Sequence, residues 1–262
     1  MHKIAFQFGS FTITWYGILV ASGFLAGLWN ASRRAVSVGI AAEQVLDLGP
    51  WLVIGGILGA RILYVLSYWK DYFSHQPFWE MFMVQHGGLV YYGGLIGAVL
   101  AGSIYVRHKR LPYWKTTDLL APSIALGHAF GRVGCLMNGC CYGRPTTLPW
   151  AIHFPLDHET AGVGVHPTEI YSALANLGLY VVLAWLFRRK KYDGWIFALY
   201  LVAYSVLRGW IEMYRGDYTT YYLGGHFTPA QLVSMAVFVA GVGLLYWLPR
   251  AQHPPAKHER AS

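Results

Sequence analysis

Three arginines fall inside apolar stretches of the sequence, where a charged side chain is costly. They are Arg61, Arg132 and Arg208. A charge at membrane depth costs about 3 kcal/mol on insertion scales, so it usually faces a partner or a wet cavity. The planar guanidinium fork suits phosphate oxygens. The three arginines therefore predict a polar cavity for an anion, and a structural ion pair is the alternative for any one of them.

Other polar residues accompany these arginines at helical spacing. Tyr204, Arg208 and Glu212 are spaced i, i+4 and i+8, so they share one helix face. Glu212 either orients Arg208 for a ligand or forms an ordinary salt bridge with it. His166 and Glu169 have the i, i+3 spacing of a metal pair. Because no second compact set of His, Asp or Glu accompanies that pair, we expect no metal site.

All three cysteines follow Arg132 closely, at Cys135, Cys140 and Cys141. The count is odd, so at least one thiol is free unless it pairs between chains. Three interpretations stay open: inert buried thiols, a disulfide from Cys135 to Cys140 or Cys141, and a nucleophilic thiol activated by Arg132.

Apolar helices must position these groups. The 262 residues are 55% hydrophobic and only 12% charged, which is about half the usual charged share. That balance excludes a cytosolic enzyme, a disordered chain and a secreted disulfide-rich miniprotein. A span needs about 20 apolar residues. We expect seven spans, at 13–31, 50–69, 89–106, 117–136, 168–187, 195–214 and 229–248. The sequence thus predicts an all-α integral membrane protein with one multipass domain at 1–250, a cytoplasmic tail at 251–262 and no cleaved signal peptide.

Lysine and arginine predict the orientation of these spans. Thirteen of them fall on one side of the seven-span threading and four on the other. The positive-inside rule then puts the N-terminus outside and the C-terminus in the cytoplasm. Since successive helices alternate in direction, the intramembrane polar residues all lie toward the outer leaflet. The net charge of +8 follows from this bias and from attraction to anionic headgroups, and we expect no nucleic-acid partner.

Glycines are spaced for close helix packing. The small-xxx-small pairs are Gly23/Gly27, Gly55/Gly59, Gly93/Gly97 and Gly127/Gly131. The doubled glycines Gly87-Gly88 and Gly93-Gly94 stand beside a span entrance, where exposed backbone N–H groups can bind an anion.

Several short motifs, in their order and spacing, resemble one family. The motifs are Trp15-Tyr16-Gly17, Gly59-Ala60-Arg61, Gly93-Gly94-Leu95-Ile96-Gly97, Gly131-Arg132-x-Gly134 with Asn138-Gly139 and Gly143-Arg144, His166-Pro167-Thr168-Glu169-Ile170-Tyr171, and Tyr204-x3-Arg208-x3-Glu212 with Arg215. From about Ile4 to Gly241 the chain resembles the prolipoprotein diacylglyceryl transferases of bacteria.

The resemblance implies seven spans around a lipid-accessible cavity in the bacterial inner membrane, with the chemistry near the periplasmic face. It implies that a diacylglyceryl group moves from phosphatidylglycerol to the lipobox cysteine of a lipoprotein precursor, releasing glycerol phosphate without a cofactor. The implied partners are phosphatidylglycerol, the precursor's signal peptide and membrane lipids. The family's phosphatidylglycerol-contacting arginine falls on Arg132, its essential arginine of span six on Arg208 and its tyrosine of span one on Tyr16.

Three positions depart from the family's pattern. Tyr92 stands where the family usually has histidine, Cys135 where asparagine is frequent and Cys140 where glutamate is common. The general base is then open among Tyr92, His166 with Glu169, and His128, and a paralogue with a changed acceptor is an alternative.

We expect the catalytic residues to be Arg132, Arg208, Tyr92 and His166. We expect the substrate contacts to be Tyr16, Arg61, Gly93, Gly94, Asn138, Gly143, Glu169, Tyr204, Glu212 and Gln231. The alternative function is a transporter or lipid-binding membrane protein that uses the same cavity; it requires a polar path through the inner halves of the spans, which are apolar.

Overall fold

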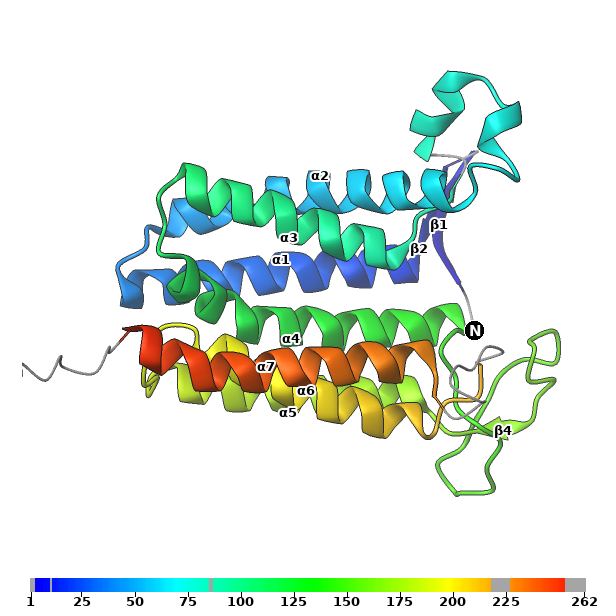
Figure 1. The fold of residues 1–262 in the computed structure, drawn as a ribbon. Coiled ribbons are helices and arrows are strands. Elements are labelled where there is room, and N and C mark those ends of the chain that lie inside the picture. The colour runs from blue at the N-terminus through cyan, green and yellow to red at the C-terminus, as the bar shows by residue number, and fades with distance from the viewer. Residues whose placement is uncertain (1–2, 10, 85–86, 218–226, 253–262) are drawn as a thin grey trace, which may run out of the picture. The chain divides into compact units, whose positions relative to one another are not determined.

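The computed structural model is largely helical and describes residues 3–9, 11–84, 87–217 and 227–252 (Figure 1). Within these residues, the helices of 18 residues or more are α1 (Trp15–Ala35), α2 (Ala42–Ser67), α3 (Tyr91–His108), α4 (Tyr113–Asn138), α5 (Thr168–Phe187), α6 (Trp195–Glu212) and α7 (Pro229–Gln252). Each predicted span overlaps one of them. The largest difference is at the start of α2, because the polar turns before the apolar run are helical as well.

Shorter elements connect the helices. The antiparallel hairpin of β1 (Ile4–Phe8) and β2 (Phe11–Thr14) precedes α1. Single turns form η1 (Val36–Val38), η2 (Phe73–His75) and η3 (Phe78–Phe82). Between α4 and α5, the strands β3 (Ile152–His153) and β4 (Gly164–Val165) pair antiparallel.

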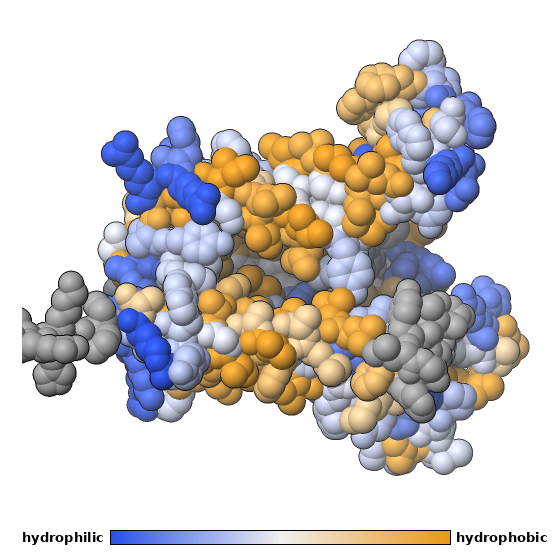
Figure 2. All heavy atoms as spheres, viewed as in Figure 1, coloured by the Kyte–Doolittle hydropathy of each residue, from blue (hydrophilic) through white to orange (hydrophobic). Residues whose placement is uncertain are grey.

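The helices have the surface of a membrane protein. Five of them, α2, α4, α5, α6 and α7, are long and apolar enough to cross a membrane. Helices α1 and α3 are long enough but less apolar, since glycines, aromatic residues and terminal arginines lower their mean hydropathy. In each part of the molecule, apolar side chains cover the middle of the helices and hydrophilic ones gather near the ends (Figure 2). The chain is therefore a multi-pass membrane protein, and seven spans remain an expectation.

The chain forms two compact units, which we describe separately: Met1–Ala31 with Thr117–Ser262, and Ser32–Thr116. In the second unit, α2 and α3 touch backbone to backbone. A Cβ added at Gly59 would overlap the carbonyl oxygen of Gly93, and one at Gly97 would overlap that of Gly55. The predicted packing role of these glycines is thus confirmed.

In the first unit, α1 packs on α4 through small residues. A Cβ at Gly23 would stand 2.6 Å from Cβ of Phe130, and one at Gly27 would stand 3.0 Å from the carbonyl oxygen of Ser123. At Gly131 an added Cβ would meet no atom within 4 Å, so the described residues give this glycine no packing role. The predicted pairing is therefore confirmed for α1 but not for Gly131.

A buried carboxylate fastens α4 to the start of α6. Asp118 is 0% exposed and accepts hydrogen bonds from the backbone N–H groups of Gly194 (2.8 Å) and Phe197 (2.9 Å). Lys190 lies 3.9 Å from the same carboxylate. Asp118 thus caps α6 from another helix, where a negative charge also meets the positive end of the helix dipole.

Alternating helix directions bring one end of each helix of this unit to the same side. The N-terminal ends of α1, α5 and α7 lie on the same side as the C-terminal ends of α4 and α6, at the right in Figure 1. The candidate residues of this unit lie in the halves of the helices nearest those ends or in the loops that adjoin them. The basic Arg188–Lys191 segment lies at the opposite end, between α5 and α6.

Candidate active site

The arginine of α6 is held by a chain of polar contacts that reaches α7. Nη1 of Arg208 lies 2.6 Å from Oε2 of Glu212, which is buried. The hydroxyl of Thr228 donates to the other oxygen of Glu212 (2.8 Å). Gln231 and Thr228 form reciprocal bonds at the start of α7: Thr228 N–H donates to Oε1 of Gln231 (3.0 Å), and Gln231 N–H donates to the Thr228 hydroxyl (3.2 Å). This is a capping box, so Gln231 has a structural use besides the expected substrate contact.

Arg132 of α4 and Arg208 of α6 both lie near one histidine, His128. His128 lies within electrostatic range of both Arg132 and Arg208. Its ring stacks on Tyr204, with centroids 5.0 Å apart, and its buried Nδ1 has no hydrogen-bond partner among the described residues. Arg132 is also within electrostatic range of Tyr204. Arg132, Tyr204 and Arg208 therefore all lie within range of one half-buried imidazole.

The segment after α4 lies between the segments that contain His166 and Tyr214, and this close packing requires glycine at position 143. Its N–H donates to the carbonyl of His166 (3.0 Å), and Arg144 N–H donates to that of Tyr214 (2.8 Å). A Cβ at Gly143 would stand 2.5 Å from Cβ of His166, so only glycine fits here. Gly143 therefore holds the loop in place, and nothing in its surroundings marks a substrate contact.

The start of α5 presents a histidine and a buried carboxylate. Nδ1 of His166 lies 3.3 Å from the hydroxyl of Tyr171, which accepts a 2.8 Å bond from Nε1 of Trp150. Glu169 is 1% exposed, and neither carboxylate oxygen has a hydrogen-bond partner among the described residues. Such a group is expensive to bury unless a ligand completes it. Glu169 is within electrostatic range of Arg132.

The three cysteines and Tyr16 lie near Arg132. All three thiols are free, so the disulfide interpretation is not borne out. Tyr16 of α1 lies against Gly134 of α4, where an added Cβ would be 3.1 Å from its ring, and within electrostatic range of Arg132. Asn138 donates from Nδ2 to the sulfur of Cys140 (3.5 Å). Tyr16 therefore lies within electrostatic range of Arg132, whereas the described contact of Asn138 is with Cys140. The expected contacts of both residues with the substrate stay predictions.

Arg61 is committed to backbone carbonyls of its own unit. Nε donates to Met81 O (2.8 Å), Nη2 to Glu80 O (2.6 Å), and Nη1 to the carbonyls of Gly87 (2.6 Å) and Gly88 (3.3 Å). Its aromatic neighbours are Tyr64 and Phe73. Gly87 and Gly88 thus present carbonyl oxygens to a cation, which corrects the expectation that they offer N–H groups to an anion.

The other predicted residues of this unit lie at the start of α3. Gly93 is buried against Gly59 and Leu63, and Gly94 lies near Ala60, so both serve the contact with α2. Tyr92 is 42% exposed and packs edge-on against Tyr91, with ring centroids 5.7 Å apart. Arg61, Tyr92, Gly93 and Gly94 belong to the second unit, and their expected roles toward the substrate stay predictions.

Two loop groups titrate away from their ordinary range. The pKa of Tyr142 is raised to about 12, first because its hydroxyl donates a 2.7 Å bond to the Glu159 carboxylate. The pKa of the Cys141 thiol is lowered, because hydrogen bonds from Cys135 and Cys140 stabilise its thiolate and Arg215 adds positive charge.

Two residues of the site, Arg215 and Thr228, were not predicted from the sequence. Arg215 is buried, binds Asp217 through two hydrogen bonds of 2.8 and 2.5 Å, and is within electrostatic range of Arg132 and Glu169. Its place in a matched motif is the one sequence signal that could have found it. The signal for Thr228 is the Thr-x-x-Gln spacing at 228–231, which is typical of a capping box.

Fold and site together define a class: a largely helical, multi-pass membrane protein with half-buried and buried arginines near one end of its larger unit. A family model described as prolipoprotein diacylglyceryl transferase matches residues 3–247. The chain belongs to this family, as its motifs led us to expect.

The sequence is similar to those of named relatives along almost their whole length. The chain is 38% identical over 250 residues to the phosphatidylglycerol–prolipoprotein diacylglyceryl transferase of Gloeobacter violaceus, covering 93% of this chain and 91% of the relative. Proteins of the same name from Finegoldia magna and Geobacillus kaustophilus are each 38% identical, covering 92% and 95% of this chain and 94% and 93% of theirs.

Proposed function

We propose that this protein transfers a diacylglyceryl group from phosphatidylglycerol to the lipobox cysteine of a prolipoprotein. Membership of the family and the names of the relatives support this activity. The cysteine sulfur forms a C–S bond to the terminal glycerol carbon of the diacylglyceryl group. The C–O bond from that carbon to phosphate breaks, the thiol proton passes to a base, and glycerol phosphate leaves with one more negative charge.

The observation that carries the proposal is that His128 lies within electrostatic range of both Arg132 and Arg208. A phosphodiester becomes a monoester as the reaction proceeds, so negative charge develops on its oxygens. Guanidinium groups already in place in a low-dielectric site stabilise that charge more strongly than water does. Arg132 and Arg208 then bind the phosphate, and Tyr16, Asn138 and Tyr204 surround the headgroup.

The proton acceptor is best supported at the start of α5. Glu169 is buried without a hydrogen-bond partner among the described residues, and His166 precedes it by three residues. A carboxylate in this setting gains by accepting a proton from an incoming thiol. We assign the base to the His166–Glu169 pair. Glu169→Gln then slows transfer strongly and Tyr92→Phe does not; the opposite ranking moves the base to Tyr92.

Orientation is part of the proposal. Seven spans, an outer N-terminus and a site facing the periplasmic leaflet of the inner membrane are supported by the separation of the polar cluster from the basic Arg188–Lys191 end. Fluorescent protein fused after residue 262 should fluoresce in cells, since it folds well in the cytoplasm. A dark fusion of full length would place the C-terminus outside.

The direct test uses purified protein, phosphatidylglycerol and a lipobox peptide. We expect a mass gain of one diacylglyceryl group on the peptide cysteine, matched by released glycerol phosphate. Arg132→Ala and Arg208→Ala should each cut turnover at least tenfold, about 1.4 kcal/mol in barrier, while Arg188→Ala, an exposed arginine at the other end, keeps it. No mass gain beside an active relative rejects the function. Transport of an unchanged solute instead would support the transporter hypothesis, which the relatives' names do not favour.

A further inference from the structure

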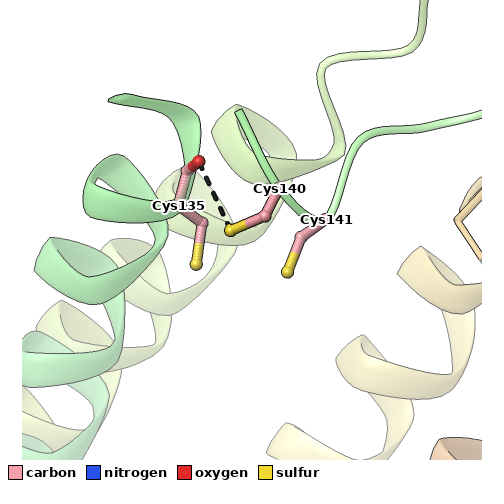
Figure 3. A group of neighbouring side chains, drawn as sticks. All are labelled: Cys135, Cys140 and Cys141. Atoms are coloured by element: carbon pink, nitrogen blue, oxygen red, sulfur yellow. Dashed lines mark hydrogen bonds between the residues drawn. The ribbon is translucent and has the colours of Figure 1, made fainter. Parts of the chain in front are cut away.

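The three cysteine sulfurs converge on one small space. Cys135 lies in the last turn of α4, and Cys140 and Cys141 lie just beyond its end. Their Sγ atoms all lie within 4.8 Å of one another, and all three residues are half-buried. Figure 3 shows the sulfurs of Cys135 and Cys140 turned toward the same gap, with that of Cys141 beside them. These are all the cysteines of the chain, so the whole thiol content is concentrated here.

The backbone fixes this arrangement. Cys140 N–H donates to the carbonyl of Cys135 (3.1 Å), and its sulfur lies 3.7 Å from the same oxygen. Cys141 has φ of +70°, a left-handed conformation that non-glycine residues rarely adopt. A 2.7 Å bond from the Thr168 hydroxyl to the Cys141 carbonyl holds it there. The chain therefore bears backbone strain at the residue that brings the third sulfur into the group.

The size of the sulfur triangle suits a thiolate-bound metal ion. Metal–sulfur bonds of about 2.3 Å place the sulfurs of a trigonal site about 4.0 Å apart. Separations of up to 4.8 Å need each sulfur to move by only a few tenths of an ångström. Among the described residues, no histidine or carboxylate joins the three sulfurs as a fourth ligand. Arg132 and Arg215 lie within electrostatic range of Cys141, and their charge offsets that of an anionic cluster.

We propose that Cys135, Cys140 and Cys141 form a three-sulfur site for one soft, thiophilic metal ion, with Cu(I) as the ion that fits best. Three-coordinate thiolate ligation suits Cu(I), whereas Zn²⁺ requires a fourth ligand and Mg²⁺ or Ca²⁺ requires oxygen. The earlier expectation of no metal considered only His166 and Glu169. The site lies on the same helix end as Arg132, one turn away, so a bound ion would stand beside the proposed phosphate site.

The test is a titration of the full chain in detergent, reduced and kept free of oxygen. Cu(I) is added in competition with a chromophoric Cu(I) chelator. We expect one ion per chain, and X-ray absorption showing three sulfur neighbours. Cys135→Ser, Cys140→Ser and Cys141→Ser should each weaken binding at least a hundredfold. Met137→Leu, which removes a sulfur from the same turn but not from the cluster, should leave the affinity unchanged.

Several results overturn the site. The first is that the reduced wild-type protein binds no Cu(I). The second is that Cys135→Ser leaves the affinity unchanged, which would reduce the site to Cys140 and Cys141. The third is that Met137→Leu loses as much affinity as the serine variants. Thermal midpoints of the serine variants identify any that fail to fold. A second measurement rests on the proposed function: Cu(I) should inhibit diacylglyceryl transfer in the wild type and not in Cys141→Ser. If transfer is absent altogether, the stoichiometry and the sulfur count still decide the metal site.

Discussion

Breaking the ion pair between Arg208 and Glu212 should show separately how the pair contributes to stability and to transfer activity. The two side chains are only 13% and 0% exposed, so water screens their 2.6 Å contact little. Glu212→Ala leaves the guanidinium charge buried without its carboxylate, which costs about 3–5 kcal/mol. For a chain of this size, the thermal midpoint then falls by roughly 10 °C. Glu212→Gln keeps the shape and exchanges a charged hydrogen bond for a neutral one, at a cost of about 1–2 kcal/mol.

The activity of these variants should follow how well Arg208 is aimed. Glu212→Gln should reduce turnover about tenfold and Glu212→Ala at least a hundredfold, equivalent to about 1.4 and 2.7 kcal/mol in barrier. The decisive variant is the double replacement Arg208→Met with Glu212→Leu. It removes both charges, so its midpoint should return close to that of the wild type, because an apolar pair can replace a buried ion pair. Its transfer activity should stay as low as that of Arg208→Ala.

The assays are thermal unfolding in detergent and transfer of diacylglyceryl to a lipobox peptide, with kcat and KM measured separately. A wild-type midpoint for Glu212→Ala would mean that the pair is solvated. A lowered midpoint with unchanged kcat would mean that Glu212 stabilises the helix end without positioning Arg208. Either result refutes the role given to Glu212.

Three further outcomes are expected. Gly143→Ala, whose Cβ would stand 2.5 Å from that of His166, should lower both the thermal midpoint and transfer, whereas Gly178→Ala, with no atom within 4 Å, should change neither; equal behaviour would contradict the loop's role. Asp118→Ala should cost about 2–5 kcal/mol in unfolding free energy by leaving two backbone N–H groups of α6 unpaired, and an unchanged midpoint would count against that cap. Because the pKa of Tyr142 is raised to about 12, its bond to Glu159 should stabilise the protein below pH 10 and lose that effect between pH 10 and 12; an ultraviolet difference titration against Tyr142→Phe should show the midpoint near pH 12 rather than 10.

Much of the fold is readable from local pattern. Apolar runs predict all seven long helices, because burial in lipid depends on composition over about 20 residues and little else. The alternating directions of the helices predict that Arg132, Arg208, His166 and Gln231 meet at one end. The i, i+4 spacing predicts the contact of Arg208 with Glu212, which the structure confirms.

Local sequence patterns do not predict backbone contacts between segments that are distant in the sequence. Nothing near Arg61 in sequence shows that carbonyls 19 to 27 residues later accept hydrogen bonds from its guanidinium. The sulfur triangle depends on a left-handed residue at Cys141, and cysteine gives no signal for that conformation. The sequence does not show that Gly143 is required for packing, because its close approach to His166 arises only when two distant segments meet.

Complementation tests the central claim most directly. In a bacterial strain depleted of its own diacylglyceryl transferase, the wild-type chain and Arg188→Ala should restore growth and lipidated lipoprotein, and Arg132→Ala and Arg208→Ala should not, although all four accumulate in the membrane. Restored lipidation by either of the last two variants would contradict the claim that both guanidinium groups hold the phosphate during transfer.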